Sequence, residues 1–291
     1  MNELKSKNFV MLKDIRDLSP DVDVSSDFSK GVISSSLTTK TFNELNVLKI
    51  LELKDSSHLT LNVKKNTNFE LAILMASDDK SLVVEAFLEE NSFARIICFS
   101  NKKSLVKHNS VCEKNSRFEA VNFSTNELVA DSVSRLKDDA SCLIINSYLN
   151  KGVDSNIKDK VIHVGENNSS LISSRSYLLN SKSDSRGLIR IEPSAFNAQG
   201  FQESNSLIEG DSRFISVPDL EILNNEVKCS HGSTISRIKD EDLFYFESRG
   251  ISKDEARKML ISGHVLGVLP SSQIKDFAND LLIDFLRGVS S

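Results

Sequence analysis

Two side chains that can bind a metal lie close together near the end of the chain. Cys229 and His231 are separated by one residue in the segment 228–234, KCSHGST. Residues i and i+2 of a strand point to the same face, with their backbones roughly 6.5–7 Å apart. If this segment is extended, both side chains could bind one metal ion or cluster. Thiolates are the usual ligands of iron–sulfur clusters, and imidazole is a minority ligand.

The same residue types also have structural explanations. A free cysteine is usually a small buried apolar residue, and a histidine beside a glycine is often a hydrogen-bonded turn residue. Cys98 and Cys142 lie inside apolar runs and are predicted to pack in the core, whereas Cys112 is undecided. Three other histidines have no ligand spacing and are predicted to be solvated or to cap an element: His58, His108 and His264.

Composition excludes several classes of function. The 291 residues carry a net charge of −5 and no dense Lys/Arg block, which argues against a nucleic-acid partner. No run approaches 18 apolar residues, and the N-terminus lacks the apolar core of a secretory signal, so no membrane association is expected. The four cysteines form no CxxC pair, which is typical of a reduced, cytoplasmic protein. Without a GxxxxGK[ST] motif, any ATP hydrolysis belongs to a partner, and no enzyme activity is predicted.

Most of the chain has the pattern of short strands. From about 32 to 227, short apolar-alternating segments rich in Val, Ile, Phe and Thr recur every 10–20 residues or so. This pattern fits a sandwich, a barrel or a β-solenoid, and periodicity does not choose between them because no exact repeat is visible. With only 11 Gly and 4 Pro, the turns must rely on Asn, Asp and Ser.

The pattern becomes helical at Asp240, which is predicted as an N-cap, and Gly250 is predicted to end this first helix. Residues 252–255 form a capping box for a second helix. Residues 274–285 form an amphipathic stripe that could pack on the β-body or bind a partner. We predict a lead-in at 1–34, a β-core at 35–235 and a helical domain at 236–291.

Several segments resemble one known family. The segment 228–234, Leu243-Phe244-Tyr245 and Ser248-Arg249-Gly250-Ile251 closely resemble the C-terminal signature of the SufB/SufD family of iron–sulfur cluster assembly scaffold proteins, most like its SufD branch. Upstream, the segment 173–178, SSRSYL, looks like another motif of the family. The resemblance is strongest over about 160–269.

The resemblance implies a mainly β fold, a right-handed parallel β-helix core with a C-terminal helical domain. It implies a scaffold subunit that pairs with a SufB-like subunit and docks a SufC-like ATPase, with an iron–sulfur cluster bound transiently and shared with the partner. Ser204 and Gly232 stand where SufB members carry a cysteine and a glutamate, so this chain is expected to lend ligands to a shared site. The candidate metal ligands are His231 and Cys229, and the candidate partner-binding residues are Phe244, Tyr245, Arg249, Gly250 and Met259.

Alternatives to this interpretation remain open. One keeps the family but makes the chain a stand-alone homodimeric scaffold that assembles the cluster on its own Cys229 and His231. A β-helix enzyme acting on polysaccharide would need aromatic subsites, and the absence of Trp counts against it. A purely structural solenoid is a further possibility. Under the scaffold hypothesis, a chain ending near Lys239 is expected to stay folded and to lose the ATPase.

Overall fold

The computed structural model describes residues 9–12, 22–27, 32–37 and 48–289. Its first strands are β1 (Phe9–Leu12), β2 (Val22–Asp27), β3 (Val32–Leu37), β4 (Leu48–Leu53), β5 (Ser57–Val63), β6 (Asn68–Met75), β7 (Lys80–Leu88), β8 (Phe93–Ser100) and β9 (Ser104–Cys112). The later strands are β10 (Arg117–Ser124), β11 (Leu128–Leu136), β12 (Ser141–Lys151), β13 (Ser155–His163), β14 (Ser169–Leu179), β15 (Lys182–Ile191), β16 (Gln199–Glu209), β17 (Arg213–Ile222) and β18 (Lys228–Ser236). The helices are α1 (Asp240–Glu247), α2 (Lys253–Leu266) and α3 (Ser272–Arg287).

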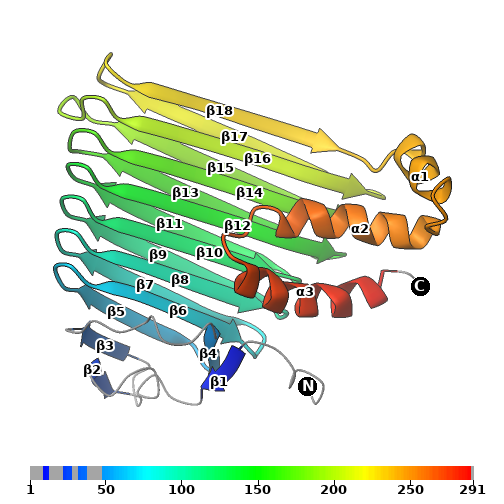
Figure 1. Ribbon diagram of the computed structural model, residues 1–291, viewed down its shortest axis with the longest axis horizontal. Coiled ribbons are helices and arrows are strands. Elements are labelled where there is room, and N and C mark those ends of the chain that lie inside the picture. The colour runs from blue at the N-terminus through cyan, green and yellow to red at the C-terminus, as the bar shows by residue number, and fades with distance from the viewer. Residues whose placement is uncertain (1–8, 13–21, 28–31, 38–47, 290–291) are drawn as a thin grey trace.

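The described strands form two facing sheets, between which the chain alternates (Figure 1). Sheet A has the order β1-β4-β6-β8-β10-β12-β14-β16-β18, and sheet B has the order β17-β15-β13-β11-β9-β7-β5-β3-β2. Neighbouring strands are parallel, except that β2 pairs antiparallel with β3. The architecture is a parallel β-solenoid with a C-terminal helical part. It confirms the fold that the family resemblance predicted, and it excludes the sandwich and the barrel.

Asparagine and aspartate shape the bend from sheet B into sheet A. Six residues at this bend have φ between 52° and 60° and lie one rung apart: Asn66, Asn91, Asn115, Asp139, Asn167 and Asn197. Asn and Asp tolerate this left-handed conformation better than other non-glycine residues. Their amides also stack, since Asn91 Nδ2 donates to Asn66 Oδ1 (3.1 Å) and Asn115 Nδ2 donates to Asn91 Oδ1 (2.8 Å). The prediction that polar residues would make the turns is therefore confirmed.

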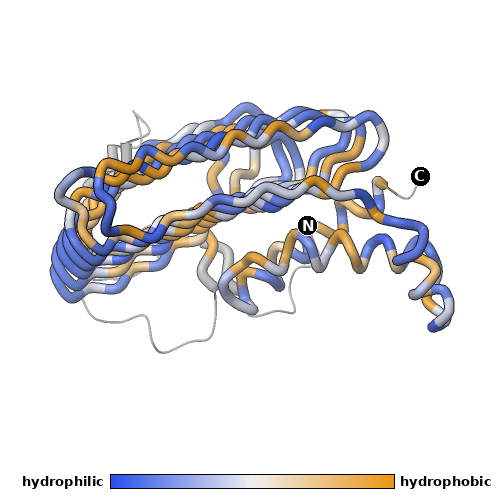
Figure 2. Tube along the Cα trace, turned by 90° about the horizontal axis from the view of Figure 1, so that it is seen from above, coloured by the Kyte–Doolittle hydropathy of each residue, from blue (hydrophilic) through white to orange (hydrophobic). Residues whose placement is uncertain are grey.

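The described residues form two apolar clusters. One fills the space between the sheets and contains residues such as Leu61, Ile96 and Ile189. The other lies between the outer face of sheet A and helices α2 and α3, which run along that face (Figure 2). Within it, the Phe99 and Phe277 rings meet edge to face with centroids 4.6 Å apart. The amphipathic stripe of 274–285 therefore packs on the β-body, mainly through residues that are fully buried there.

The helix boundaries agree with the predictions, with one correction. The N-cap of α1 is Lys239, without a side-chain cap, and Asp240 is the first helical residue, where its charge favours the positive end of the helix dipole. The capping box of Ser252 and Glu255 is present. In the predicted lead-in, 9–12 and 22–27 are strands, and the remainder before 32 lies outside the described residues. The domain boundaries at 34 and 235 stay predictions.

Candidate metal-binding site and partner surfaces

Cys229 and His231 lie on β18, the last strand of sheet A. In the register between β16 and β18, Cys229 faces Gly200 and His231 faces Gln202. Cys229 packs against the apolar cluster between the sheets, which shows that its side chain points into the solenoid. His231, two residues along the same strand, projects from the same face. The strand therefore presents both side chains together, at the end of the solenoid where the stack of rungs stops.

The Cys229 thiol is half-buried and free of any disulfide. Burial raises its pKa above the ordinary value, and the Gly200 backbone N–H, which donates to the sulfur, partly opposes that shift. A raised pKa keeps the thiol protonated near neutral pH and makes it a slow nucleophile. A metal ion that bound there would displace the proton, so binding would depend on pH.

His231 is exposed, and no described side chain forms a hydrogen bond or ion pair with it. Its imidazole is therefore available as a ligand. The neighbouring Gln202 is held in place, because its Nε2 donates to the Asp219 carbonyl (3.0 Å). Its Oε1 occupies the space that a Cβ at Gly187 would need. This explains why glycine stands at 187 in the rung below His231.

The ligand set at this end is incomplete. Among the described residues, no group of three or more His, Cys, Asp or Glu side chains is arranged to hold a metal ion. Cys98, Cys112 and Cys142 are buried, and burial raises the pKa of each thiol, that of Cys112 to about 12. An iron–sulfur cluster is usually held by four protein ligands. Cys229 and His231 supply two, so the other two would have to come from another chain.

Three histidines were predicted to be solvated or to cap an element, and the structure agrees for His58 but not for His108. His58 lies beside Glu85, with 3.3 Å between Nε2 and Oε2, and is partly solvated. His108 is fully buried, so the prediction for it was wrong. His264, on α2, is half-buried, with its Nε2 3.1 Å from the Ser176 carbonyl oxygen. His108 and His264 both have polar partners on strands that are distant from them in the sequence. The spacing of residues in the sequence does not reveal such partners.

The solenoid ends without a cap in the described part of the chain. No described strand pairs with the outer edge of β18 or of β17. Large apolar side chains are exposed on and beside these terminal strands, among them Phe201 (38%), Ile222 (42%) and Ile235 (51%). An open strand edge is a template for pairing with another chain. The edge that carries Cys229 and His231 is thus also a candidate protein interface.

A second candidate surface lies on α1 and the start of α2. Leu243 anchors α1, while Phe244 (70% exposed) and Tyr245 (58%) point outward, as does Met259 (52%) on α2. The Arg249 guanidinium lies 5.4 Å from the centre of the Tyr245 ring, so it holds that ring in a cation–π contact.

The turn between α1 and α2 is built around Gly250. This glycine has φ +81°, and its N–H donates to the Glu247 carbonyl. The Ile251 N–H then donates to Phe246, so both bonds satisfy carbonyls at the end of α1. The conformation at Gly250 therefore sets the angle at which α1 leaves α2.

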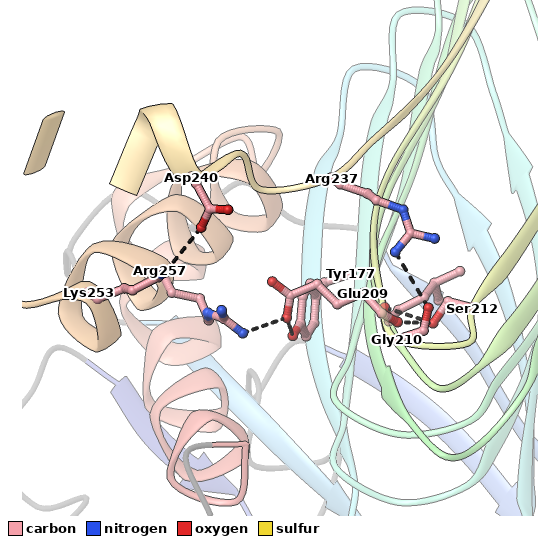
Figure 3. A network of polar contacts seen from close by, with 9 residues as sticks. Tyr177, Glu209, Gly210, Ser212, Arg237, Asp240, Lys253 and Arg257 are labelled. Carbon is pink, nitrogen blue, oxygen red and sulfur yellow. Dashed lines mark hydrogen bonds and ion pairs between the residues drawn. The ribbon is translucent and has the colours of Figure 1, made fainter. Parts of the chain in front are cut away.

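A polar network fastens the helices to the solenoid (Figure 3). Arg257 on α2 lies 3.2 Å from Glu209 Oε2 on β16, and the Tyr177 hydroxyl donates to the same oxygen (2.8 Å). Burial and the Glu209 carboxylate both raise the pKa of Tyr177. At the other end of the network, Lys253 Nζ lies 3.1 Å from Asp240 Oδ1 and joins α2 to α1. The position of α1 is thus tied to the rim of the solenoid.

These features define a class of protein, a parallel β-solenoid that offers an incomplete ligand pair at an open end and a helical surface at its rim. A family model described as "SUF system FeS cluster assembly, SufBD core domain" matches residues 51–264. The chain belongs to this SufB/SufD family.

Relatives from both branches of the family match parts of the chain. A SufBD family protein of Synechocystis sp. is 34% identical over 43% of this chain and 25% of its own length. SufB of Bacillus subtilis is 29% identical over 64% of this chain and 42% of its own length. SufD of Escherichia coli is 42% identical over 26% of this chain and 18% of its own length. The matched part is therefore less than half of each of these relatives. None of the helices in the described residues is long and apolar enough to span a membrane.

Proposed function

We propose that this chain is a SufD-like, non-catalytic scaffold subunit of an iron–sulfur cluster assembly complex. Its open end pairs with a SufB-like subunit, and its α1–α2 surface docks a SufC-like ATPase that supplies ATP hydrolysis. The cluster is the cargo, bound transiently between the two scaffold subunits. We place the complex in the cytoplasm, because all four thiols of this chain are free.

One observation carries the proposal. Cys229 and His231 project from the same face of the last strand, at an edge that no described strand covers, and the described residues supply no third ligand to complete a metal site with them. Two ligands at an open edge suit a site that a partner completes. A half-buried thiol with a raised pKa is also suited to hold a cluster only while the partner is present, since the protonated thiol is a poor ligand.

The cluster site is tested by co-expressing this chain with SufB and SufC chains and counting iron and sulfide under anaerobic conditions. His231→Ala should lower both counts while the complex keeps its size, because an exposed imidazole contributes little to folding. His58→Ala, a histidine in another rung, is the matched control and should change nothing. Unchanged iron and sulfide in the His231→Ala complex would refute the ligand role.

The docking surface needs a different test from the one that the sequence suggested. A chain ending near Lys239 would expose the apolar face of sheet A that α2 and α3 cover, so a loss of ATPase binding in that chain would not by itself identify the docking surface. Substitution of outward side chains avoids this difficulty. Phe244→Ser and Tyr245→Ser remove rings that are mostly exposed, and they should leave the melting temperature unchanged.

A buried aromatic anchor contributes about 2 kcal/mol to an interface, so each substitution should weaken ATPase binding about 30-fold. Ile283→Ser, at an exposed apolar position on α3, is the control and should bind as the wild type does. Full ATPase stoichiometry in the Phe244→Ser/Tyr245→Ser double variant would refute the docking role.

A stand-alone homodimer is the second candidate. Two copies joined at β18 would supply two Cys229 thiolates and two His231 imidazoles, which makes four ligands in one site. Size analysis of the chain expressed alone separates the candidates. A dimer that binds iron and sulfide without any SufB chain favours the homodimer, and a monomer that gains them only with SufB favours the shared site.

A further inference from the structure

A row of polar side chains crosses the interior of sheet B, far from Cys229 in the chain. His108 on β9, Ser132 on β11 and Asp159 on β13 stand side by side in the strand register. All three are buried, with exposed fractions of 0%, 1% and 4%. Polar groups in such an interior are strongly destabilising unless they are hydrogen-bonded.

The row is joined to the opposite sheet through two asparagines. His108 Nε2 lies 3.1 Å from Asn122 Oδ1. Asn122 Nδ2 donates to Asn146 Oδ1 (2.8 Å), and Asn146 Nδ2 donates to Asp159 Oδ2 (2.7 Å). Because an amide oxygen can only accept, His108 donates from Nε2, and its Nδ1 carries a lone pair. Burial lowers the pKa of His108 to about 4, although the bond to Asn122 opposes that shift, so the ring is neutral.

Three buried atoms of the row have no hydrogen-bond partner among the described residues: His108 Nδ1, Ser132 Oγ and Asp159 Oδ1. The Ser132 hydroxyl is near enough to lower the pKa of Asp159, yet its geometry falls short of a hydrogen bond. Serine is shorter than the two side chains that flank it in the row. The three unpartnered atoms belong to side chains that are adjacent in the strand register, so a single small polar partner could satisfy all of them.

We propose that an ordered water molecule binds between His108, Ser132 and Asp159 and completes a closed ring of hydrogen bonds inside the solenoid. The water donates to His108 Nδ1 and accepts from the Ser132 hydroxyl. Its third hydrogen bond joins it to Asp159 Oδ1, which accepts from the water when the carboxyl group is ionised and donates to it when the group is protonated. Three hydrogen bonds are the usual number for a buried water. Every polar atom of the ring then has a partner, and the two sheets are cross-linked at the middle rungs.

A neighbouring serine pair provides an internal control. Ser110 Oγ donates to Ser134 Oγ at 2.7 Å, in the adjacent row of the same two strands β9 and β11. This pair leaves no atom unpartnered. Ser110 therefore needs no water, which makes it a matched comparison for Ser132.

The test is a crystal structure of the full chain at a resolution that shows ordered solvent. A density peak should lie about 2.6–3.2 Å from His108 Nδ1, Ser132 Oγ and Asp159 Oδ1. Ser132→Ala should keep the peak with two contacts, and Ser132→Val should expel the water and lower the urea midpoint. Ser110→Ala should leave the peak unchanged.

Two results would overturn the proposal. One is a dry interior in the wild-type crystal, or a peak that contacts fewer than two of the three atoms. The other is a Ser132→Val chain whose urea midpoint equals that of the wild type. If Ser132→Val fails to fold, the wild-type and Ser132→Ala crystals still decide the question. Neither depends on cluster assembly, so the outcome is independent of the proposed function.

Discussion

Asp159 should make the stability of this protein fall as the pH rises toward neutrality. Its carboxyl group is fully buried, and this burial raises its pKa from 3.8 to about 7. The nearby Ser132 hydroxyl and the hydrogen bond from Asn146 oppose the shift, while the nearby Asp131 charge adds to it. Asp159→Asn keeps the size of the side chain and an oxygen for Asn146, but removes the group that titrates.

The sign and size follow from proton linkage. Between the two pKa values the folded chain binds more protons at Asp159 than the unfolded chain does, so the free energy of unfolding falls as the pH rises. The contribution is complete below the unfolded value of 3.8 and is lost once the pH passes about 7. At 1.36 kcal/mol for each pKa unit, the whole loss is about 4 kcal/mol.

The assay is urea unfolding followed by circular dichroism at a series of pH values from about 4 to about 8. The wild type should lose stability relative to Asp159→Asn across this range, and the variant should be the more stable protein at the upper end. Asp211→Asn, which removes an exposed carboxylate that does not act on Asp159, is the control and should keep the wild-type slope. Parallel curves for the wild type and Asp159→Asn would refute the reasoning.

Three further outcomes are expected. Phe277→Ala, which empties the contact with Phe99 under α3, should destabilise the fold by about 3–5 kcal/mol in urea unfolding. Gly250→Ala places a side chain at φ +81° and should cost about 1–2 kcal/mol, with weaker ATPase binding because α1 is misplaced. Native iodoacetamide treatment near neutral pH should modify Cys229 alone and slowly, and mass spectrometry should show four modified cysteines only after unfolding.

The sequence contained a repeat that exact matching does not detect. Asn66, Asn91, Asn115, Asp139 and Asn167 recur at nearly regular intervals, and each sits in the left-handed conformation at the same bend. What repeats is one turn residue for each rung, while the strand residues vary because any apolar side chain of suitable size fills the interior. A search for spaced Asn and Asp would have favoured a solenoid over a sandwich before any family resemblance was considered.

The buried polar ring had no such signal. His108 and Asp159 lie 51 positions apart in the chain, and only the strand register brings them into one row across β9, β11 and β13. Alternation along each strand indicates which residues share a face, but it does not indicate which rung lies beside which. The prediction that His108 is solvated failed for this reason, because its partners come from other rungs.

The opposite holds for Cys229 and His231, whose relation depends only on local geometry. A spacing of two within a strand predicts a shared face, and β18 provides it. The direction of that face depends on the fold, and so does the absence of a following rung. The sequence could therefore name the pair, whereas its exposure at an open end required the structure.

The interior of the solenoid becomes more polar toward the end that carries this pair. One inward-facing row across sheet A changes from apolar to polar along the stack: Ile73, Cys98, Asn122, Asn146, Ser174, Ser204 and Ser233. Apolar burial supplies most of the stabilisation in such a stack, and each rung is stabilised chiefly by its neighbours. The last rung has a polar interior and a neighbour on one side only, so it should open locally at a lower free energy than the middle rungs.

Hydrogen exchange measures this difference directly. In the isolated chain, amides of β18 should exchange much faster than those of β10, which has paired strands on both sides. Addition of a SufB-like subunit should slow exchange in β18 and leave β10 unchanged, because binding stabilises only the states in which the last rung is formed. Equal protection of β18 and β10 in the isolated chain would contradict this account, since a rung that is stable alone needs no partner to hold Cys229 and His231 in place.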